Sequence, residues 1–267
     1  MNNIFSKILC SVTIGSMVSA AAIASSNPDS IRLLAANTTS TTLMATVVKE
    51  ANMLYPVALQ SGMNKSIEYV QKFCNKKRSY LIGTYQKGKQ LFPTVIGVLK
   101  KYDLPQELKV LIALESDFNG NAVSRAGAVG YWQMMDEAAR DYGLKTGSKS
   151  KDERKNLAKS TVAAAKYLKD RCRNLKNDLL LTVASYNCGV GGVKNAMRKS
   201  GKSNPDFWDI KKYLPSETRL YVMNFIALNV VFNNYDKFVA NKMVFNSETI
   251  DIPLTRDPAT VHRSVMD

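Results

Sequence analysis

The sequence contains a single histidine, His262, which stands near its end. A Ser-His-Asp triad, a Cys-His pair and an HExxH zinc site each need a histidine in the folded part of a protein. Because the only histidine lies in what reads as a tail, these three kinds of site are disfavoured. We expect any catalysis to use carboxylate, lysine, tyrosine, serine or cysteine side chains, and we predict no metal site and no cofactor.

Long apolar runs are also scarce, and only residues 8–24 form one. Lys7 precedes this run, and the sequence Ala-Ile-Ala at 22–24 follows the small-x-small rule for signal cleavage. No later run approaches the roughly 20 residues that a membrane-spanning helix needs. We therefore expect residues 1–24 to be an export signal, and the mature protein to be soluble and to lie in the periplasm or cell envelope.

Acidic residues are few relative to basic ones: 22 Asp and Glu against 37 Lys and Arg, a formal net charge of +15. Such a balance favours an anionic partner, either nucleic acid, a membrane surface or an anionic cell-wall polymer, unless the charge is only a solvated surface. The glycines at 189–192 do not match a phosphate-binding loop, and the chain has no nucleic-acid-binding motif. With the export signal, this makes nucleic acid an unexpected partner.

Cysteines are few and odd in number beyond the signal, namely Cys74, Cys172 and Cys188. An oxidising compartment would allow at most one internal disulfide among them, and the sequence does not select the pair. Three small buried side chains without any bond are an equal alternative.

Helical periodicity dominates the rest of the chain, which indicates an all-α class. Residues 25–42 are rich in Ser, Thr and Asn and predict a disordered linker. Beyond residue 236, alternating apolar residues predict either a strand pair or an ordered tail. The helices are predicted over 43–99 with breaks near Gly62, Gly83–Gly88 and Pro93, and then over 105–116, 131–142, 153–175, 179–187, 193–199 and 216–235.

The helix at 105–116 carries the most unusual carboxylate. Leu108, Leu111, Ile112 and Glu115 follow the i, i+3, i+4, i+7 rule and share one face. A glutamate in line with an apolar stripe loses hydration, which raises its pKa toward the range that a general acid needs near neutral pH. The alternative is a glutamate at a frayed helix end, whose carboxylate reaches solvent or a salt bridge.

The residues after Glu115 suit a sugar ligand. The loop that follows is rich in small residues, which let the backbone approach a ligand closely. Ser124 and Gln133 offer uncharged hydrogen bonds for hydroxyl and acetamido groups. Tyr186, near the end of an apolar helix, could stack on a sugar face and donate a hydrogen bond.

These segments together resemble the family 1 lytic transglycosylases, whose fold is goose-lysozyme-like. The matching segments are Glu115-Ser116, Ala122–Ser124, Gly127–Gly130, Gln133–Met135, Ser185–Gly189 and Glu217–Val222. Leu104–Leu108 and Asp206–Trp208 point to the membrane-bound murein transglycosylase D branch. The resemblance implies an all-α, lysozyme-like (goose-type) orthogonal helical domain over 99–235, preceded by a linker and N-terminal helical extension over 25–98 and followed by a tail over 236–267.

The resemblance also implies a function. Such enzymes cut the MurNAc–GlcNAc β-1,4 bond of peptidoglycan and leave a 1,6-anhydro-MurNAc end, so Glu115 would serve as acid and then as base. Peptidoglycan strands would be the partner of a monomer, with envelope machinery as a further partner. The implied substrate-binding residues are Ser116, Ser124, Gln133, Met135, Tyr186, Asn187, Glu217 and Tyr221.

Several departures and alternatives stay open. Asn119–Asn121 replaces a common proline, Cys188 stands where a small residue such as serine is usual, and no wall-binding repeats follow the domain. Asp117 would point about 200° away from Glu115 on a helix, so it is a poor second catalyst. A muramidase that uses water, or a non-catalytic wall-binding or assembly protein, are the alternative functions.

Overall fold

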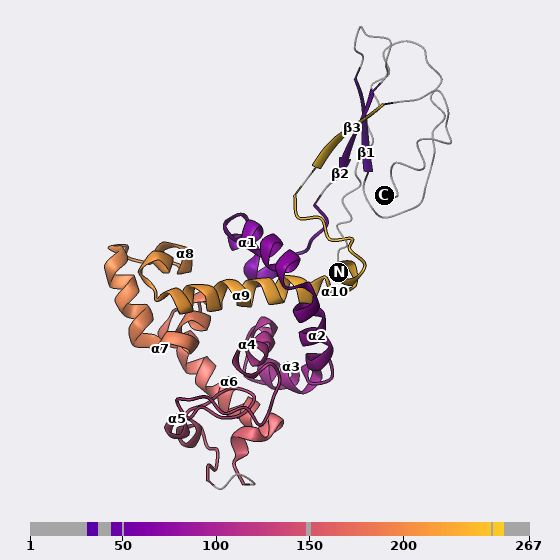
Figure 1. Cartoon of the computed structure of the whole chain (residues 1–267). Helices are drawn as coiled ribbons and strands as arrows, with labels where there is room; N and C mark the ends of the chain where they lie inside the picture. Colours follow the sequence, from indigo (N-terminus) through magenta and orange to yellow (C-terminus); the bar gives the residue numbers. More distant parts are fainter. Residues whose placement is uncertain (1–30, 37–43, 50, 148–150, 247, 254–267) are drawn as a thin grey trace, which may run out of the picture.

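The computed structural model describes residues 31–36, 44–49, 51–147, 151–246 and 248–253. It shows a body of short helices with a small sheet beside it (Figure 1). The predicted export signal at 1–24 and the tail segment that holds His262 lie outside the described residues. Among the described helices, none is both long and apolar enough to cross a membrane.

Helices make up most of the body between Val57 and Val239, which confirms the all-α class predicted for this part of the chain. The α-helices are α1 Met63–Lys76, α2 Arg78–Gly88, α3 Phe92–Lys101, α4 Leu111–Ser116, α5 Asp136–Asp141, α6 Leu157–Asn174, α7 Leu179–Ser200, α8 Phe207–Ile210, α9 Ser216–Asn233 and α10 Tyr235–Val239. The 3-10 helices are η1 Val57–Gly62, η2 Gln106–Val110, η3 Glu153–Lys155 and η4 Lys211–Tyr213.

Helix α9 crosses the middle of the body, and α1, α2, α4 and α7 pack against it (Figure 1). Val222, Phe225 and Ile226 in this helix are at most 1% exposed, and buried residues occur on every turn. A helix that is apolar all round belongs in the centre of a domain. α9 is therefore the scaffold on which the other helices place their side chains.

A three-stranded antiparallel sheet joins segments from the two ends of the described chain. It consists of β1 Ile31–Ala36, β2 Met44–Lys49 and β3 Glu248–Pro253, with β2 in the centre. Val47 pairs with Leu33 on one side and with Ile250 on the other.

The sheet corrects two predictions. Residues 31–36 were predicted as part of a disordered linker and residues 44–49 as helix, and both are strands. β-branched residues such as Thr46, Val47 and Val48 favour strands, and pairing with a distant segment outweighed the local composition. The strand at 248–253 agrees with one of the two alternatives for the tail.

Two asparagines tie the start of the helical body to its end. Asn52 donates its backbone N–H to the Val244 carbonyl over 3.1 Å and accepts the Val244 N–H at its side-chain oxygen over 2.9 Å. Asn234 bonds to Leu54 through its side-chain amide, which accepts the Leu54 N–H over 2.9 Å and donates to the Leu54 carbonyl over 2.8 Å. These bonds fix the extension against α9 and α10.

Three further predictions are corrected within the helical body. Only Asp136–Asp141 is α-helical in the segment predicted as a helix over 131–142. The preceding residues form turns, because Gly130 and Gln133 have φ angles of 82° and 46°. Of the break predicted near Gly83–Gly88, helix α2 continues through Gly83 and ends at Gly88. The first turns of the helix predicted over 105–116 are 3-10.

The three described cysteines form no disulfide. Cys74 and Cys172 are buried, and burial raises the pKa of Cys74 to about 12. Cys188 is half-buried, so only two of the three cysteines fit the alternative of small buried side chains. Of the alternatives left open by the sequence, the structure has the one without a bond.

Candidate active site

Helix α4 places Glu115 at the edge of the core. Leu111 and Ile112, one turn earlier, are fully buried, as the predicted apolar stripe requires. The helix ends one residue after Glu115, at Ser116, because Asp117 and Phe118 both adopt left-handed backbone conformations with φ angles of 48° and 63°. The carboxylate therefore sits at the last turn of a short, rigid helix.

The surroundings of Glu115 favour its protonated form. Burial raises its pKa from 4.5 to about 7, and the nearby Glu217 carboxylate adds to the increase. The Tyr221 hydroxyl on α9 donates a hydrogen bond of 2.5 Å to Glu115 Oε1, which opposes the increase by stabilising the carboxylate. A pKa near neutrality lets one carboxyl group give up a proton and take one back.

Aromatic rings surround this carboxylate. The rings of Tyr167 and Tyr186 meet edge to face with centroids 5.4 Å apart, and Tyr142 meets Tyr167 in the same way. Burial and the Glu115 charge raise the pKa of Tyr221 and Tyr186 well above 10, so both hydroxyls remain protonated donors. Tyr167 was not among the site residues predicted from the sequence. Its only signal was an aromatic residue beside the apolar stripe of α6.

Ser116 and Tyr186 hold the backbone of the neighbouring loop. The Ser116 hydroxyl donates to the Tyr131 carbonyl over 2.8 Å, and the Tyr186 hydroxyl donates to the Trp132 carbonyl over 2.7 Å. Both hydroxyl protons are thus used within the protein. Their role as substrate-binding residues stays a prediction, and in this structure both hydroxyls hold the loop.

Ser124 and Gln133 also bond within this loop. Ser124 Oγ accepts the Ala128 N–H over 3.0 Å. Gln133 Nε2 donates to the carbonyls of Ala122 and Gly130 over 3.1 and 2.9 Å. The amide oxygen of Gln133 and the hydroxyl proton of Ser124 have no such partner among the described residues, so they are the groups left for a ligand.

Met135 lies exposed at the start of α5, with 47% of its surface accessible. An exposed, flexible thioether next to a polar loop can cover the apolar face of a sugar ring. The structure thus leaves Met135 available for the contact that the resemblance implies.

Asn187 joins the end of the apolar part of α7 to the start of α9. Its side-chain oxygen accepts the Thr218 hydroxyl over 2.7 Å, and its nitrogen donates to Glu217 over 3.3 Å. The helix breaks directly afterwards at Gly189, whose φ of 75° and ψ of 158° suit glycine alone. Glu217 itself is exposed and lies near enough to Glu115 to affect its pKa.

Asp117 is occupied elsewhere. Its carboxylate pairs with Lys87 and accepts a hydrogen bond of 3.3 Å from Thr84, both on α2. This contact agrees with the prediction that Asp117 is a poor second catalyst, although the left-handed turn and not a helical angle directs it away.

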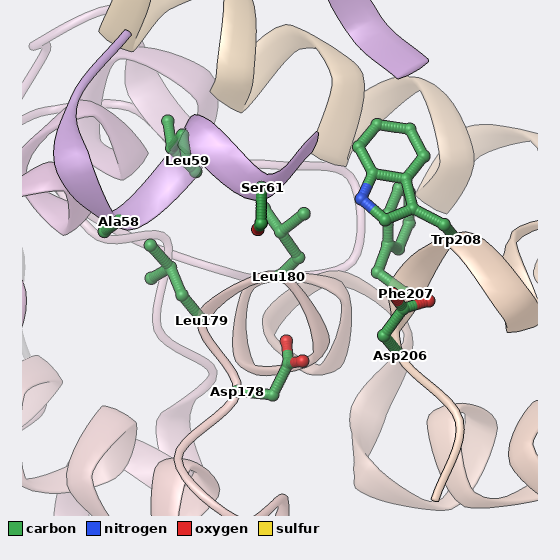
Figure 2. Close-up of a pocket in the computed structure, with 9 residues that line it drawn as sticks. All are labelled: Ala58, Leu59, Ser61, Asp178, Leu179, Leu180, Asp206, Phe207 and Trp208. Atoms are coloured by element: carbon green, nitrogen blue, oxygen red, sulfur yellow. The ribbon is translucent and has the colours of Figure 1, made fainter. Parts of the chain in front are cut away.

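A separate pocket of about 170 Å³ lies between η1, the start of α7 and α8. Figure 2 shows the Trp208 ring at one side of it and Asp178 and Asp206 below. Both carboxylates accept backbone N–H groups as helix N-caps. None of the predicted site residues lines this pocket.

Part of the helical body matches a known class of domain. Residues 96–208, which include Glu115, match the family described as Transglycosylase SLT domain. The match confirms the resemblance seen in the sequence motifs.

A particular relative is the membrane-bound lytic murein transglycosylase D of Escherichia coli strain K12. It is 36% identical over 174 residues, which are 64% of this chain and 37% of that protein. The chain thus spans little more than a third of the length of this curated relative.

Two solved structures are also similar. One is an inactive mutant of the lytic transglycosylase Slt from Pseudomonas aeruginosa, with a TM-score of 0.47 and 22% identity over 57% of this chain and 24% of that one. The other is a 70-kDa soluble lytic transglycosylase in complex with bulgecin A, with a TM-score of 0.48 and 19% identity over 70% of this chain and 38% of that one.

Proposed function

We propose that this protein is a lytic transglycosylase that cleaves peptidoglycan without consuming water. The observation that carries the proposal is the half-buried carboxyl group of Glu115, with a pKa of about 7 and a hydrogen bond from Tyr221. The match to the SLT domain and the relative named as a murein transglycosylase support the substrate class.

In the proposed reaction, protonated Glu115 donates its proton to the oxygen of the MurNAc–GlcNAc bond while the bond from C1 of MurNAc to that oxygen breaks. The C6 hydroxyl oxygen of the same MurNAc then bonds to C1, and its proton passes to the Glu115 carboxylate. The acid is regenerated and a 1,6-anhydro end is left. Because the substrate supplies the nucleophile, no second carboxylate has to form a bond.

The other residues would serve binding. Met135 would cover a sugar face, and the free amide oxygen of Gln133 would accept a hydroxyl or acetamido N–H. Glu217, beside Asn187, would hold or polarise the substrate near Glu115. We further propose an exported protein in the cell envelope, whose basic surface adds affinity for the wall.

A hydrolase is the second candidate, and the position of Glu217 favours it. An exposed carboxylate close to Glu115 could act as a base toward water, as in an inverting glycosidase. The two functions differ in product, since hydrolysis gives a reducing-end sugar that is one water heavier than the anhydro sugar.

Digestion of purified peptidoglycan, followed by mass spectrometry, tests the proposal. We expect anhydro ends from the wild type, and a loss of at least about 100-fold for Glu115→Gln, because a general acid contributes that much or more. Asp117→Asn is the matched control, and it should retain activity. Reducing ends would establish the hydrolase instead. Wall cleavage that survived Glu115→Gln would refute a catalytic role for this residue.

A further inference from the structure

The loop beside Glu115 has an irregular backbone that needs support. Residues 130–135 run through two left-handed conformations, at Gly130 and Gln133, before α5 begins. Within it, Val129 and Met134 exchange backbone hydrogen bonds of 3.1 and 3.2 Å. This short segment carries Gln133 and Met135, two of the residues that the resemblance implies for glycan binding.

A buried ion pair from another part of the chain contacts this loop. Asp152 and Arg154 are only 8% and 7% exposed. Arg154 Nε and NH2 donate to the Asp152 carboxylate over 2.9 and 2.6 Å. The remaining nitrogen, NH1, donates to the Met134 carbonyl over 3.2 Å, one residue before Met135.

The backbone of the same segment also touches the loop. A Cβ atom on Gly130 would lie 2.0 Å from the Arg154 carbonyl oxygen, and one on Gly120 would lie 3.1 Å from the Lys155 carbonyl oxygen. Helix η3 therefore contacts the start of the loop at Gly130, where only glycine fits this close approach. At Gly120 the Tyr131 ring lies nearer than η3, with Cε2 2.6 Å from the added Cβ.

A buried ion pair is weak evidence for stability, because desolvation offsets most of its attraction. Its geometry offers another reason for its presence. A guanidinium can bond a carboxylate with two nitrogens and direct a third to a carbonyl, whereas a lysine has no such rigid fork. Arg154 bonds in this way: Nε and NH2 donate to Asp152, and NH1 donates to the Met134 carbonyl.

We propose that Arg154, held in place by Asp152, is a positioning residue that fixes Gln133 and Met135 for binding of the glycan strand. The proposal rests on the proposed function. Arg154 acts together with Ser116 and Tyr186, which hold the carbonyls of the two loop residues before Gln133. Arg154 holds the carbonyl of the residue after Gln133.

The test is steady-state kinetics of Arg154→Lys on soluble glycan fragments, with the pH profile of kcat/KM. We expect KM to rise about tenfold with a much smaller change in kcat, because small misplacements of binding groups cost affinity. The pH midpoint should stay that of the wild type, since Glu115 and Tyr221 belong to α4 and α9.

Asn234→Ala is the control for a loss of stability alone. Asn234 is 5% exposed and bonds to Leu54 and Val230, away from the loop. It should lower the melting temperature and leave KM unchanged. An equal rise in KM for both variants would overturn the proposal, as would a folded Arg154→Lys variant with the wild-type KM.

Asp152→Asn carries the test if Arg154→Lys does not fold. It keeps the guanidinium and weakens its anchor, so KM should rise in the same direction, and an unchanged KM would overturn the proposal. Equilibrium binding of the fragment, measured in the Glu115→Gln background, separates the two proposals. A protein that neither cleaves nor binds glycan refutes the proposed function, whereas normal cleavage with unaltered KM in the variants refutes only the role of Arg154.

Discussion

Two opposing effects on the Glu115 side chain set its pKa. Burial against the core favours the neutral acid, while the hydrogen bond from Tyr221 favours the carboxylate. A fully buried glutamate without that bond would hold its proton too tightly to act as an acid near neutral pH. The balance leaves the pKa at about 7, between the two roles that the proposed reaction assigns to this group.

Removing the Tyr221 hydroxyl should shift this balance in a known direction. In Tyr221→Phe the carboxylate loses a donor, so the pKa of Glu115 rises above about 7. Since the acid must be protonated to react, the alkaline limb of the kcat/KM profile should move to higher pH. We expect kcat itself to fall about 10- to 100-fold from lost orientation, as for other acid–base groups.

Tyr213→Phe is the control for this experiment. Tyr213 lies in η4, and its hydroxyl makes no hydrogen bond among the described residues. Its profile should match that of the wild type. An alkaline limb of Tyr221→Phe that stayed in place or moved to lower pH would contradict the assigned contact.

Helix α7 shows how one backbone conformation places a site residue. The helix starts at the N-cap Asp178, whose side chain accepts the Leu181 N–H over 2.8 Å, and it is interrupted at Gly189. The interruption directly follows Asn187 and Cys188, so the end of the first part of the helix points toward the start of α9. The glycine run in the sequence predicted this break.

Gly189→Ala should therefore destabilise the protein. No heavy atom lies within 4 Å of the added Cβ, so the cost comes from the backbone angles alone and should be about 1–3 kcal/mol. Gly191→Ala is the matched variant, because it also has open space but lies in a helical conformation. It should be neutral or stabilising by up to about 1 kcal/mol. Urea unfolding measures both, and equal effects would contradict the interpretation.

The segment at 131–142 shows the limit of reading elements from the sequence. Its apolar and polar residues fit a helix, yet helix begins only at Asp136. Contacts from α4, η3 and α7 take up the carbonyl groups that a helix would use internally. Such partners are distant in sequence, so local periodicity carries no signal of them.

Net charge is a property of the whole molecule. The net charge of +15 is spread over many exposed lysines and arginines, and we expect it to add long-range attraction to an anionic wall. This long-range attraction differs from the specific contacts near Glu115, because dissolved salt screens it.

Sedimentation with purified peptidoglycan sacculi should measure this contribution. Raising the ionic strength from about 0.01 M to about 1 M shortens the screening length from about 30 Å to about 3 Å. We expect the bound fraction to fall strongly, whereas KM for short glycan fragments, which carry few charges, should change much less. Binding to sacculi that did not depend on salt would show that the basic surface has no such role.

The sequence by itself determined the helical class, the boundaries of α6 and α9 to within a few residues, the start of α7, and the position of Glu115 on an apolar stripe. These features follow from local periodicity and from the positions of glycine and proline, which are signals carried by residues close together in the sequence. The family resemblance named most residues around Glu115.

Only the tertiary structure decided what those residues do. It placed Tyr167 beside Tyr186, directed the Ser116 and Tyr186 hydroxyls to loop carbonyls, and brought Arg154 to Met134. It also joined the two ends of the described chain in a sheet. Each of these contacts joins residues that are distant in sequence or depends on burial, and a pKa near 7 for Glu115 exists only once the surrounding side chains exclude water.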